Sequence, residues 1–313
     1  MKKIFIIVIF SLCSWVGKAQ QMPLFTQYLS NPYLVLPATA GMRYETNIKL
    51  TSRMSGLGIQ GAPTSVFLTA NTCLVQKGGF KHGIGISFFN DKAGLLGRTN
   101  ANVIYSFHLP LNPSEGVYWA TGFNMGIQSY NFDEAGKVVI SPDDPVANTS
   151  FNANAIDGGV SSILYSPDFF IGLGSNLISS RQVKWFNSNK IDGIHQLMAG
   201  YRLAFADNKC GIVPSVLVRK VGTLLQYDAS ATFRVKDYFW TGITYRGKQG
   251  IAMMLGAGGK NFNFTYSYDY FKQSGFSGFH EITFGVRFAK KANRDGEPYR
   301  YKPKDALRVP TLW

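Results

Sequence analysis

Apolar and polar side chains alternate along most of this sequence. From Asn261 to Tyr270, every even position carries Phe or Tyr and every odd position carries Asn, Thr, Ser or Asp. A period of two is typical of a β-strand whose two faces meet different surroundings. The alternation recurs more often than a half-buried soluble sheet requires. It predicts an outer-membrane β-barrel with aromatic side chains facing lipid and polar side chains facing the lumen.

About fourteen segments alternate in this way, each close to the length of a membrane-spanning strand. The expected fold is therefore all-β, a transmembrane antiparallel β-barrel of about 14 strands that occupies residues 43–289. A soluble two-sheet β-sandwich is the alternative, although it needs fewer strands. The predicted strands are Arg43–Arg53, Thr64–Leu74, His82–Asn90, Arg98–Leu109, Val117–Gln128, Ala155–Tyr165, Asp168–Leu177, Ile194–Phe205, Cys210–Lys220, Leu225–Val235, Tyr238–Tyr245, Gly250–Ala257, Asn261–Tyr270 and Phe279–Ala289.

The lengths of the connections follow their order along the chain. The odd-numbered connections include Asn131–Asn154 and Ile178–Gly193, the two longest, whereas the even-numbered ones include Ser166-Pro167 and Lys236-Asp237. Bacterial barrels place short turns in the periplasm and longer loops outside. The order therefore predicts that the chain enters the barrel from the periplasm.

Both ends of the chain are expected to lie outside the barrel. Lys2 and Lys3 precede a short apolar stretch, and Gly17-Lys18-Ala19 has the small residues of a cleavage site, so residues 1–19 are predicted to be a secretory signal peptide. No later segment has the roughly 20 continuous apolar residues of a transmembrane helix. Because an even strand count returns the chain to its starting side, residues 20–42 and the basic tail 290–313 are both expected in the periplasm.

The chain is strongly basic, with a net charge of +14. Removal of Lys2, Lys3 and Lys18 leaves 29 basic and 18 acidic residues, a net charge of +11. Nucleic acid is a common partner of such a charge, but an exported barrel has little access to it. We therefore expect no nucleic-acid partner, and favour anionic outer-membrane lipid and acidic periplasmic proteins.

Few residues suggest catalysis or metal binding. His82, His108 and His195 have no Cys, Asp or Glu at metal-ligand spacing. Cys73 and Cys210 are far apart, and the chain has neither a G-x-S-x-G elbow nor a phosphate-binding loop. The sequence predicts a non-catalytic protein without a cofactor or metal. A lipid-modifying barrel enzyme is the alternative, and it would need a Ser–His pair near the outer leaflet.

Charged side chains at lumen-facing positions are the first group of candidate site residues. Their mixed signs favour pairing that braces the wall over a selectivity filter, because selective pores tend to carry rings of one sign. They are Arg98, Arg202, Asp228, Arg234, Asp269, Glu281 and Arg287. Aromatic residues near strand ends are expected instead at the membrane interfaces; they are Tyr44, Tyr118, Trp119, Tyr238 and Trp240.

Several short motifs occur together in one order. Phe25-Thr26-Gln27-Tyr28, Asn31-Pro32 and Pro37-Ala38-Thr39-Ala40-Gly41 follow the signal peptide, and Phe279-His280-Glu281-Ile282 begins the last strand. With Arg53–Pro63 and the stretch from His82 to Gly94, they resemble the PorP/SprF family of outer-membrane components of the type IX secretion and gliding system.

The resemblance implies a barrel in the cell outer membrane that binds or anchors other proteins. Its implied partners are type IX secretion components, including a peptidoglycan-binding, OmpA-like periplasmic protein, and exported cargo with a C-terminal sorting domain. An outer-membrane porin or solute uptake channel is the alternative. The basic tail is the expected docking segment for a periplasmic partner, because it combines apolar anchors with steering charges; these are Tyr299, Arg300, Lys302, Lys304, Arg308 and Trp313.

Overall fold

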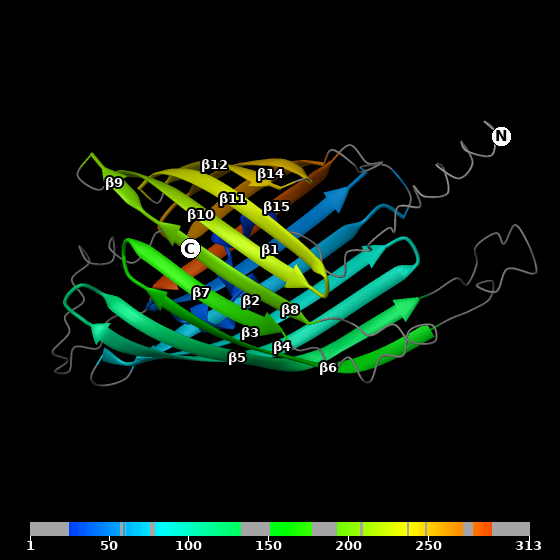
Figure 1. Ribbon diagram of the computed structural model, residues 1–313, viewed down its shortest axis with the longest axis horizontal. Coiled ribbons are helices and arrows are strands. Elements are labelled where there is room, and N and C mark those ends of the chain that lie inside the picture. Colours follow the sequence, from blue (N-terminus) through cyan, green and yellow to red (C-terminus); the bar gives the residue numbers. More distant parts are fainter. Residues whose placement is uncertain are drawn as a thin grey trace, which may run out of the picture.

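In the described part of the chain, fifteen strand segments form one antiparallel sheet that closes into a barrel (Figure 1). The computed structural model describes residues 25–56, 59, 61–75, 79–132, 151–176, 193–206, 209–236, 238–247, 249–271 and 278–289. The first segment pairs with the last as well as with the second, which closes the sheet. The segments are β1 (Glu45–Ser55), β2 (Thr64–Val75), β3 (Lys81–Ala93), β4 (Leu96–Asn112), β5 (Val117–Phe132), β6 (Phe151–Tyr165), β7 (Phe169–Asn176), β8 (Ile194–Tyr201), β9 (Leu203–Phe205), β10 (Cys210–Val221), β11 (Leu224–Val235), β12 (Phe239–Arg246), β13 (Gly250–Gly258), β14 (Phe262–Phe271) and β15 (Phe279–Ala289).

The barrel has fourteen strand positions, as predicted, because β8 and β9 share one of them. Both segments pair with β10 in one continuous register. The interruption falls at Arg202, across from the part of β10 that contains Pro214, and proline has no N–H to donate to the ladder. The Arg202 N–H donates instead to the Asp168 carbonyl at 2.6 Å.

The two ends of the barrel differ. The connections β5–β6 and β7–β8 span residues 133–150 and 177–193, and both lie at the end where β1 finishes. This end is termed the long-loop end, and the opposite one the short-turn end. Because β5 and β6 continue pairing as far as Phe132 and Phe151, the first connection is shorter than the expected 131–154. Outward positions in this extension, such as Asn131 and Asn152, are polar.

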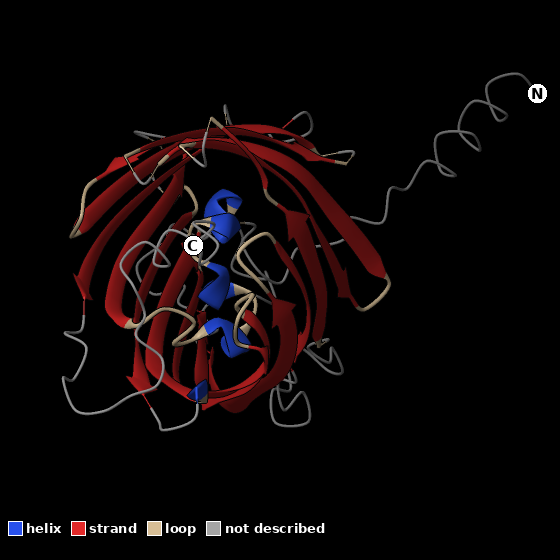
Figure 2. Cartoon of the chain, turned by 90° about the vertical axis from the view of Figure 1, so that its left-hand side faces the viewer, coloured by secondary structure: helices blue, strands red, loops and turns tan. Residues whose placement is uncertain are grey.

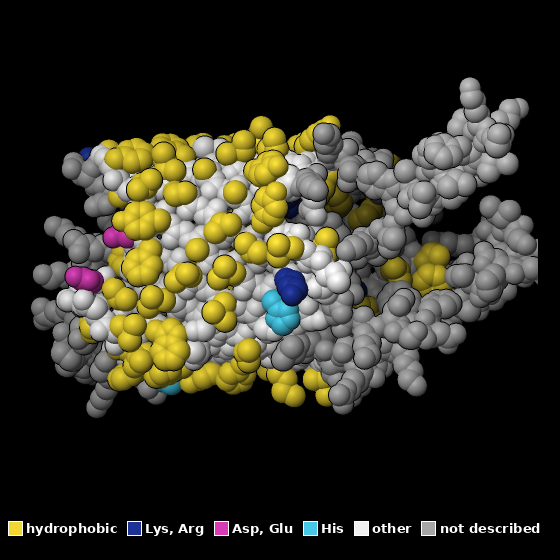
Figure 3. Space-filling model, viewed as in Figure 1, with side chains coloured by type: hydrophobic (Ala, Val, Ile, Leu, Met, Phe, Trp, Pro, Cys, Tyr) yellow, Lys and Arg dark blue, Asp and Glu magenta, His cyan; other side chains and the backbone are white. Residues whose placement is uncertain are grey.

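The outward face of the barrel is apolar. On β14, the outward Phe264 and Tyr266 are 45% and 37% exposed, whereas the inward Thr265 and Ser267 are buried. Figure 3 shows hydrophobic side chains spread across the face that carries β7, β8 and β10. Among the described residues, no helix is long and apolar enough to cross a membrane.

Only some of the expected interface aromatics face outward. Trp119 and Tyr238 are 45% and 61% exposed on the outer surface. Trp240 is buried, and Tyr118 lies against the buried inward Lys81, as does Tyr44, whose ring centroid is 4.9 Å from the Lys81 Nζ atom. The expectation is therefore wrong for Tyr118, Trp240 and Tyr44. Consecutive strand residues point to opposite faces, so Tyr118 and Trp119 cannot both contact lipid.

Residues 25–42 lie inside the barrel, where Figure 2 shows their short helical turns surrounded by strands. The turns are the 3-10 helices η1 (Thr26–Leu29), η2 (Pro32–Leu34) and η3 (Pro37–Thr39). Residues 25–42 are here termed the plug. Their position corrects the expectation that residues 20–42 lie outside the barrel in the periplasm; residues 20–24 are outside the described part of the chain. Pro32 and Pro37 stand at the first turn of their helices, where a missing N–H costs nothing.

The plug forms the apolar core of the molecule together with one side of the wall. Leu36 is fully buried, and it belongs to a cluster with Ile163 of β6 and Phe170 of β7. A second cluster joins Phe25 to Phe67 and Phe89 on the neighbouring strands β2 and β3. Full burial of one such side chain contributes about 1.5–3 kcal/mol. These two clusters show that the inward face of the barrel is apolar where the hydrophobic residues of the plug contact it.

Candidate functional site

Six charged side chains meet in the lumen in the half nearer the long-loop end. They come from β1, β10, β11, β12, β14 and β15. Three are guanidinium groups and three are carboxylates, so their formal charges balance. This charge cluster consists of Arg53, Arg219, Arg246, Asp228, Asp269 and Glu281.

Arg53 and Arg246 share the carboxylates at the centre of the cluster. Arg53 Nη1 is 2.5 Å from Asp269 Oδ2 and 3.1 Å from Glu281 Oε2. Arg246 Nη1 is 3.3 Å from the same Asp269 oxygen. On the adjoining strands, Arg219 Nη2 lies 2.9 Å from Asp228 Oδ2. All three carboxylates are at most 2% exposed, and buried charges of this kind are tolerated only when they are paired.

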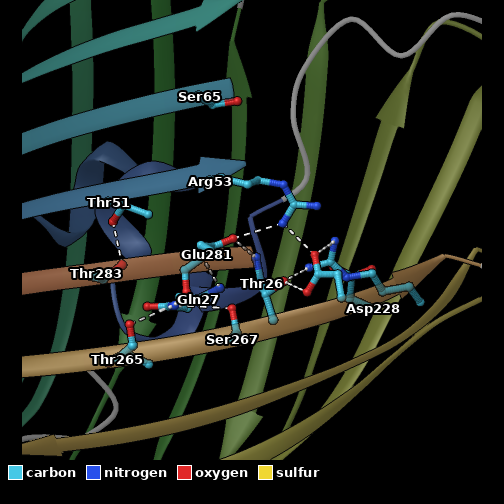
Figure 4. Close-up of polar contacts among 12 residues, drawn as sticks. Thr26, Gln27, Thr51, Arg53, Ser65, Asp228, Thr265, Ser267, Glu281 and Thr283 are labelled. Carbon is cyan, nitrogen blue, oxygen red and sulfur yellow. Dashed lines mark hydrogen bonds and ion pairs between the residues drawn. The ribbon is translucent and has the colours of Figure 1, made fainter. Parts of the chain in front are cut away.

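The first turn of the plug binds directly to this cluster (Figure 4). The backbone N–H groups of Thr26 and Gln27 each donate to the Glu281 carboxylate at 3.0 Å. These are the N–H groups that a helical turn leaves without internal partners, and a charged acceptor makes the stronger kind of hydrogen bond. The Thr26 hydroxyl accepts from Arg246 Nη2 at 2.7 Å and contacts Asp269 Oδ1. The cluster is therefore the anchor for the N-terminal end of the plug.

Side chains of the plug extend this anchor around the wall. Gln27 Nε2 donates to the Glu281 carbonyl at 3.1 Å, and the Tyr28 hydroxyl is 3.0 Å from Ser230 Oγ on β11. Asn31 Nδ2 donates to Thr69 Oγ1 on β2 at 3.2 Å. Three consecutive parts of the plug thus contact three different regions of the barrel.

Two buried lysines hold carbonyl groups further along the plug. Lys49 of β1 donates to the Ser30 carbonyl, and Lys81 of β3 donates to the Met42 carbonyl at 3.3 Å. The Lys81 ammonium also lies 3.9 Å from the centroid of the Tyr118 ring, which favours a cation. Since Lys81 is the first residue of β3, the plug ends at the short-turn end, where the chain enters β1.

A histidine on β4 fixes the carbonyl group of Ala40. Ser106 Oγ donates to this carbonyl at 2.6 Å, and His108 Nε2 lies 2.8 Å from it. His108 Nδ1 is 2.9 Å from the Tyr165 hydroxyl. All three wall residues are buried, so this Ser–His pair faces the plug within the lumen and has no contact with lipid.

The sequence-predicted lumen charges all lie at inward positions, but they do not form one site. Asp228, Asp269 and Glu281 belong to the charge cluster. Arg98 Nη2 donates to Gln128 Oε1 at 3.0 Å, and Arg202 is buried. The other two lie near the short-turn end: the Arg234 guanidinium is 5.1 Å from the centroid of the Trp240 ring, and Arg287 donates to the Gly259 carbonyl at 2.7 Å.

Sequence reasoning missed part of the cluster and the whole plug. Arg53, Arg219 and Arg246 occupy inward positions, so the period-two pattern could have identified them. The apolar sequence Leu34-Val35-Leu36 at the centre of the plug also indicated burial, because a segment exposed in the periplasm would not need a run of apolar side chains. The predicted docking residues Tyr299, Arg300, Lys302, Lys304, Arg308 and Trp313 lie outside the described residues.

Replacement of Gly122 by Val is expected to displace the plug. A Cβ atom at Gly122 would lie 2.6 Å from both the N and Cα atoms of Ala38, and this backbone cannot move without the plug. Overpacking of this kind costs about 1–3 kcal/mol, so limited chymotrypsin digestion at Tyr28 and Tyr33 should become about tenfold faster. Gly158→Val is the matched control, because its Cβ would meet only the Asn124 carbonyl, at 3.5 Å. Equal protection of the two variants would contradict this packing.

Comparison with known proteins identifies a family and a fold. The model of the family described as type IX secretion system membrane protein PorP/SprF matches residues 17–286. The toluene transporter TbuX of Ralstonia pickettii has a similar structure, with a TM-score of 0.51 and 12% identity over 82% of this chain and 93% of that chain. The deltaS2 mutant of the TodX monoaromatic hydrocarbon channel has a TM-score of 0.51 and 9% identity over 85% and 94%. A comparison with curated proteins found no match. At these identities the structural likeness establishes the barrel fold alone.

Proposed function

The chain belongs to the PorP/SprF family of type IX secretion system membrane proteins, and from this premise we propose that its barrel anchors exported cargo and periplasmic secretion components. Its family and fold place it in the outer membrane. The observation that carries the proposal is the plug, which packs into the lumen and binds the wall from Thr26 to Met42. A barrel of fourteen strands is narrower than the open porins, and the lumen of this one contains the plug. A role as a binding platform fits such a barrel better than a role as a conduit for protein.

The two ends of the barrel suit different partners under this proposal. The long-loop end would face outward and hold cargo that bears a C-terminal sorting domain. The short-turn end would face the periplasm, where β15 finishes at Ala289 and the basic tail begins. The tail carries seven Lys or Arg residues and three Asp or Glu residues, which suits an acidic surface. At the short-turn end, the proposed partners are other type IX components, including the peptidoglycan-binding, OmpA-like periplasmic protein. The plug cannot share this task, because it is buried.

Deletion of residues 290–313 is expected to release the periplasmic partner and leave the barrel folded. The described strands end at Ala289, so the deletion leaves all of the described strand pairing in place. Tagged protein would be purified from native outer membrane in mild detergent, and co-purifying chains identified by mass spectrometry. A second variant keeps the full length of the tail but replaces four of its basic residues by Gln, and it shows whether charge or length matters; these residues are Arg300, Lys302, Lys304 and Arg308. Lys260→Gln is the control, because it removes one exposed charge from a turn at the same end of the barrel. Partner recovery at the normal yield from the deletion variant would overturn the docking role.

One geometric feature favours the enzyme alternative. Ser175 Oγ on β7 lies 3.0 Å from His195 Nδ1 on β8, and both side chains face outward near the long-loop end. No Asp or Glu faces outward on the described strands, so these strands supply no carboxylate to orient the histidine as hydrolases require. We therefore retain a non-catalytic function.

A further inference from the structure

On the outward face of the described strands, lysines and histidines are the side chains that can carry a charge near neutral pH. The inside–outside alternation of the described strands places every Asp, Glu and Arg on the inward face. Those that point outward are two lysines and three histidines, namely His82, Lys92, His195, Lys220 and His280. The outer surface of these strands therefore includes basic groups and no acidic ones.

These basic groups are also concentrated at one end. Lys92, His195, Lys220 and His280 each stand one residue inside a strand terminus at the long-loop end. A lipid-facing charge costs about 2–4 kcal/mol at the bilayer midplane and about 0–1 kcal/mol near the interface. The two lysines therefore place the membrane interface at this level of the barrel.

Three of the outward polar residues form a continuous row across β7, β8 and β10. Lys220 is the register partner of His195, and His195 is the register partner of Ser175, to which it is also hydrogen bonded. Two residues closer to the short-turn end, the same strands present Val218, Leu197 and Leu173. The row therefore borders the apolar band. Figure 3 shows a cationic side chain and a histidine side by side on this largely hydrophobic face.

We propose that Ser175, His195 and Lys220 bind the phosphate group of an outer-leaflet lipid. The Lys220 ammonium supplies the charge, and the hydroxyl and imidazole groups supply neighbouring hydrogen-bond donors. The acyl chains of the same lipid would lie along Leu173 and Leu197, which are 61% and 43% exposed. This apolar continuation assigns the phosphate to a lipid and not to a free anion. The inference rests on the long-loop end facing outward, and it is independent of the anchoring role.

The test compares lipid binding by the full-length protein and its variants. Native mass spectrometry in mild detergent would measure binding of lipid A that carries phosphate groups, of the same lipid after dephosphorylation, and of inorganic phosphate. One lysine near an anionic lipid surface contributes about a fivefold change in affinity, so Lys220→Gln should weaken binding of phosphorylated lipid A about fivefold. The His195→Ala and Ser175→Ala double variant should weaken it as well, and Lys220→Arg should retain it.

Lys260→Gln is the matched control, because it removes an exposed lysine at the short-turn end. It should leave lipid binding unchanged. Dephosphorylated lipid should bind the parent and Lys220→Gln equally. Equal binding of phosphorylated lipid by the parent and Lys220→Gln would overturn the proposal, and so would displacement of the lipid by inorganic phosphate. Co-purification of secretion partners should be the same for all these variants, which separates a failure here from a failure of the proposed function.

Discussion

Deletion of residues 25–41 is expected to convert an electrically silent barrel into a conducting one. The plug contacts β14 and β15 through Gln27, β2 through Asn31 and β3 through Met42, so it crosses most of the lumen. Its removal would leave polar groups of the wall, including the balanced charge cluster, in contact with water. Conductance of the purified protein in a planar bilayer measures the change, and steady current steps should appear with the deletion variant alone.

The matched control for this experiment is the deletion of residues 290–313, which shortens the chain at the other terminus and should remain silent. The heat-dependent mobility of each variant in detergent gels would establish that the barrel has folded. Steady conductance of the intact protein would show that the plug leaves an open path through the lumen, and it would support the solute channel instead. Silence of a folded variant that lacks residues 25–41 would show that other parts of the chain close the barrel.

Replacement of Arg53 by Ala is expected to destabilise the barrel by about 3–5 kcal/mol, the usual cost of removing one partner from a buried ion pair. Arg53 is 3% exposed and contacts both Asp269 and Glu281. Without it, Glu281 loses this ion pair and keeps its hydrogen bonds to the plug, while Asp269 keeps its contacts with Arg246 and Thr26. The free energy of unfolding, measured by urea titration in detergent or lipid vesicles, should fall accordingly.

Two further variants test whether charge causes this loss. Met54→Ala changes the next residue of the same strand, at an outward position, and should cost much less. Arg53→Met combined with Glu281→Gln removes one charge of each sign and preserves most of the side-chain volume. It should therefore recover part of the stability lost in Arg53→Ala. If the double variant is as unstable as Arg53→Ala, unpaired charge is not the reason for the effect.

Much of the wall was predictable because a strand encodes its two faces locally. The period of two gave fourteen strand positions and the inward orientation of residues such as Asp269 and Glu281. The period of two did not predict the end of a strand where pairing continues beyond the lipid boundary. The pairing of β5 with β6 continues through the polar Asn131 and Asn152, since backbone hydrogen bonds persist beyond the apolar band. Tyr118 and Trp240 lie on the inward face, as the period of two places them; their aromatic character alone suggested the membrane interfaces.

The plug was missed because its structure does not depend on a repeating pattern. Its 3-10 turns contain three or four residues each, too few for a helical period to appear. Pro32 and Pro37 also resemble the residues of an exposed connection. The buried state of Tyr28 and Leu36 arises from the wall that surrounds them, and that wall is built from strands far along the chain.

The sequence by itself determined the class of fold, the number of strands and the face on which each strand residue lies. These properties follow from neighbours two positions apart, and the lipid bilayer enforces them on every strand. Only the tertiary structure decided what fills the lumen and which charges meet there. Arg53 reaches Asp269 across 216 residues, and Thr26 reaches Glu281 across 255. Such contacts exist only after β1 pairs with β15, because closure of the barrel creates the enclosed space in which the plug binds.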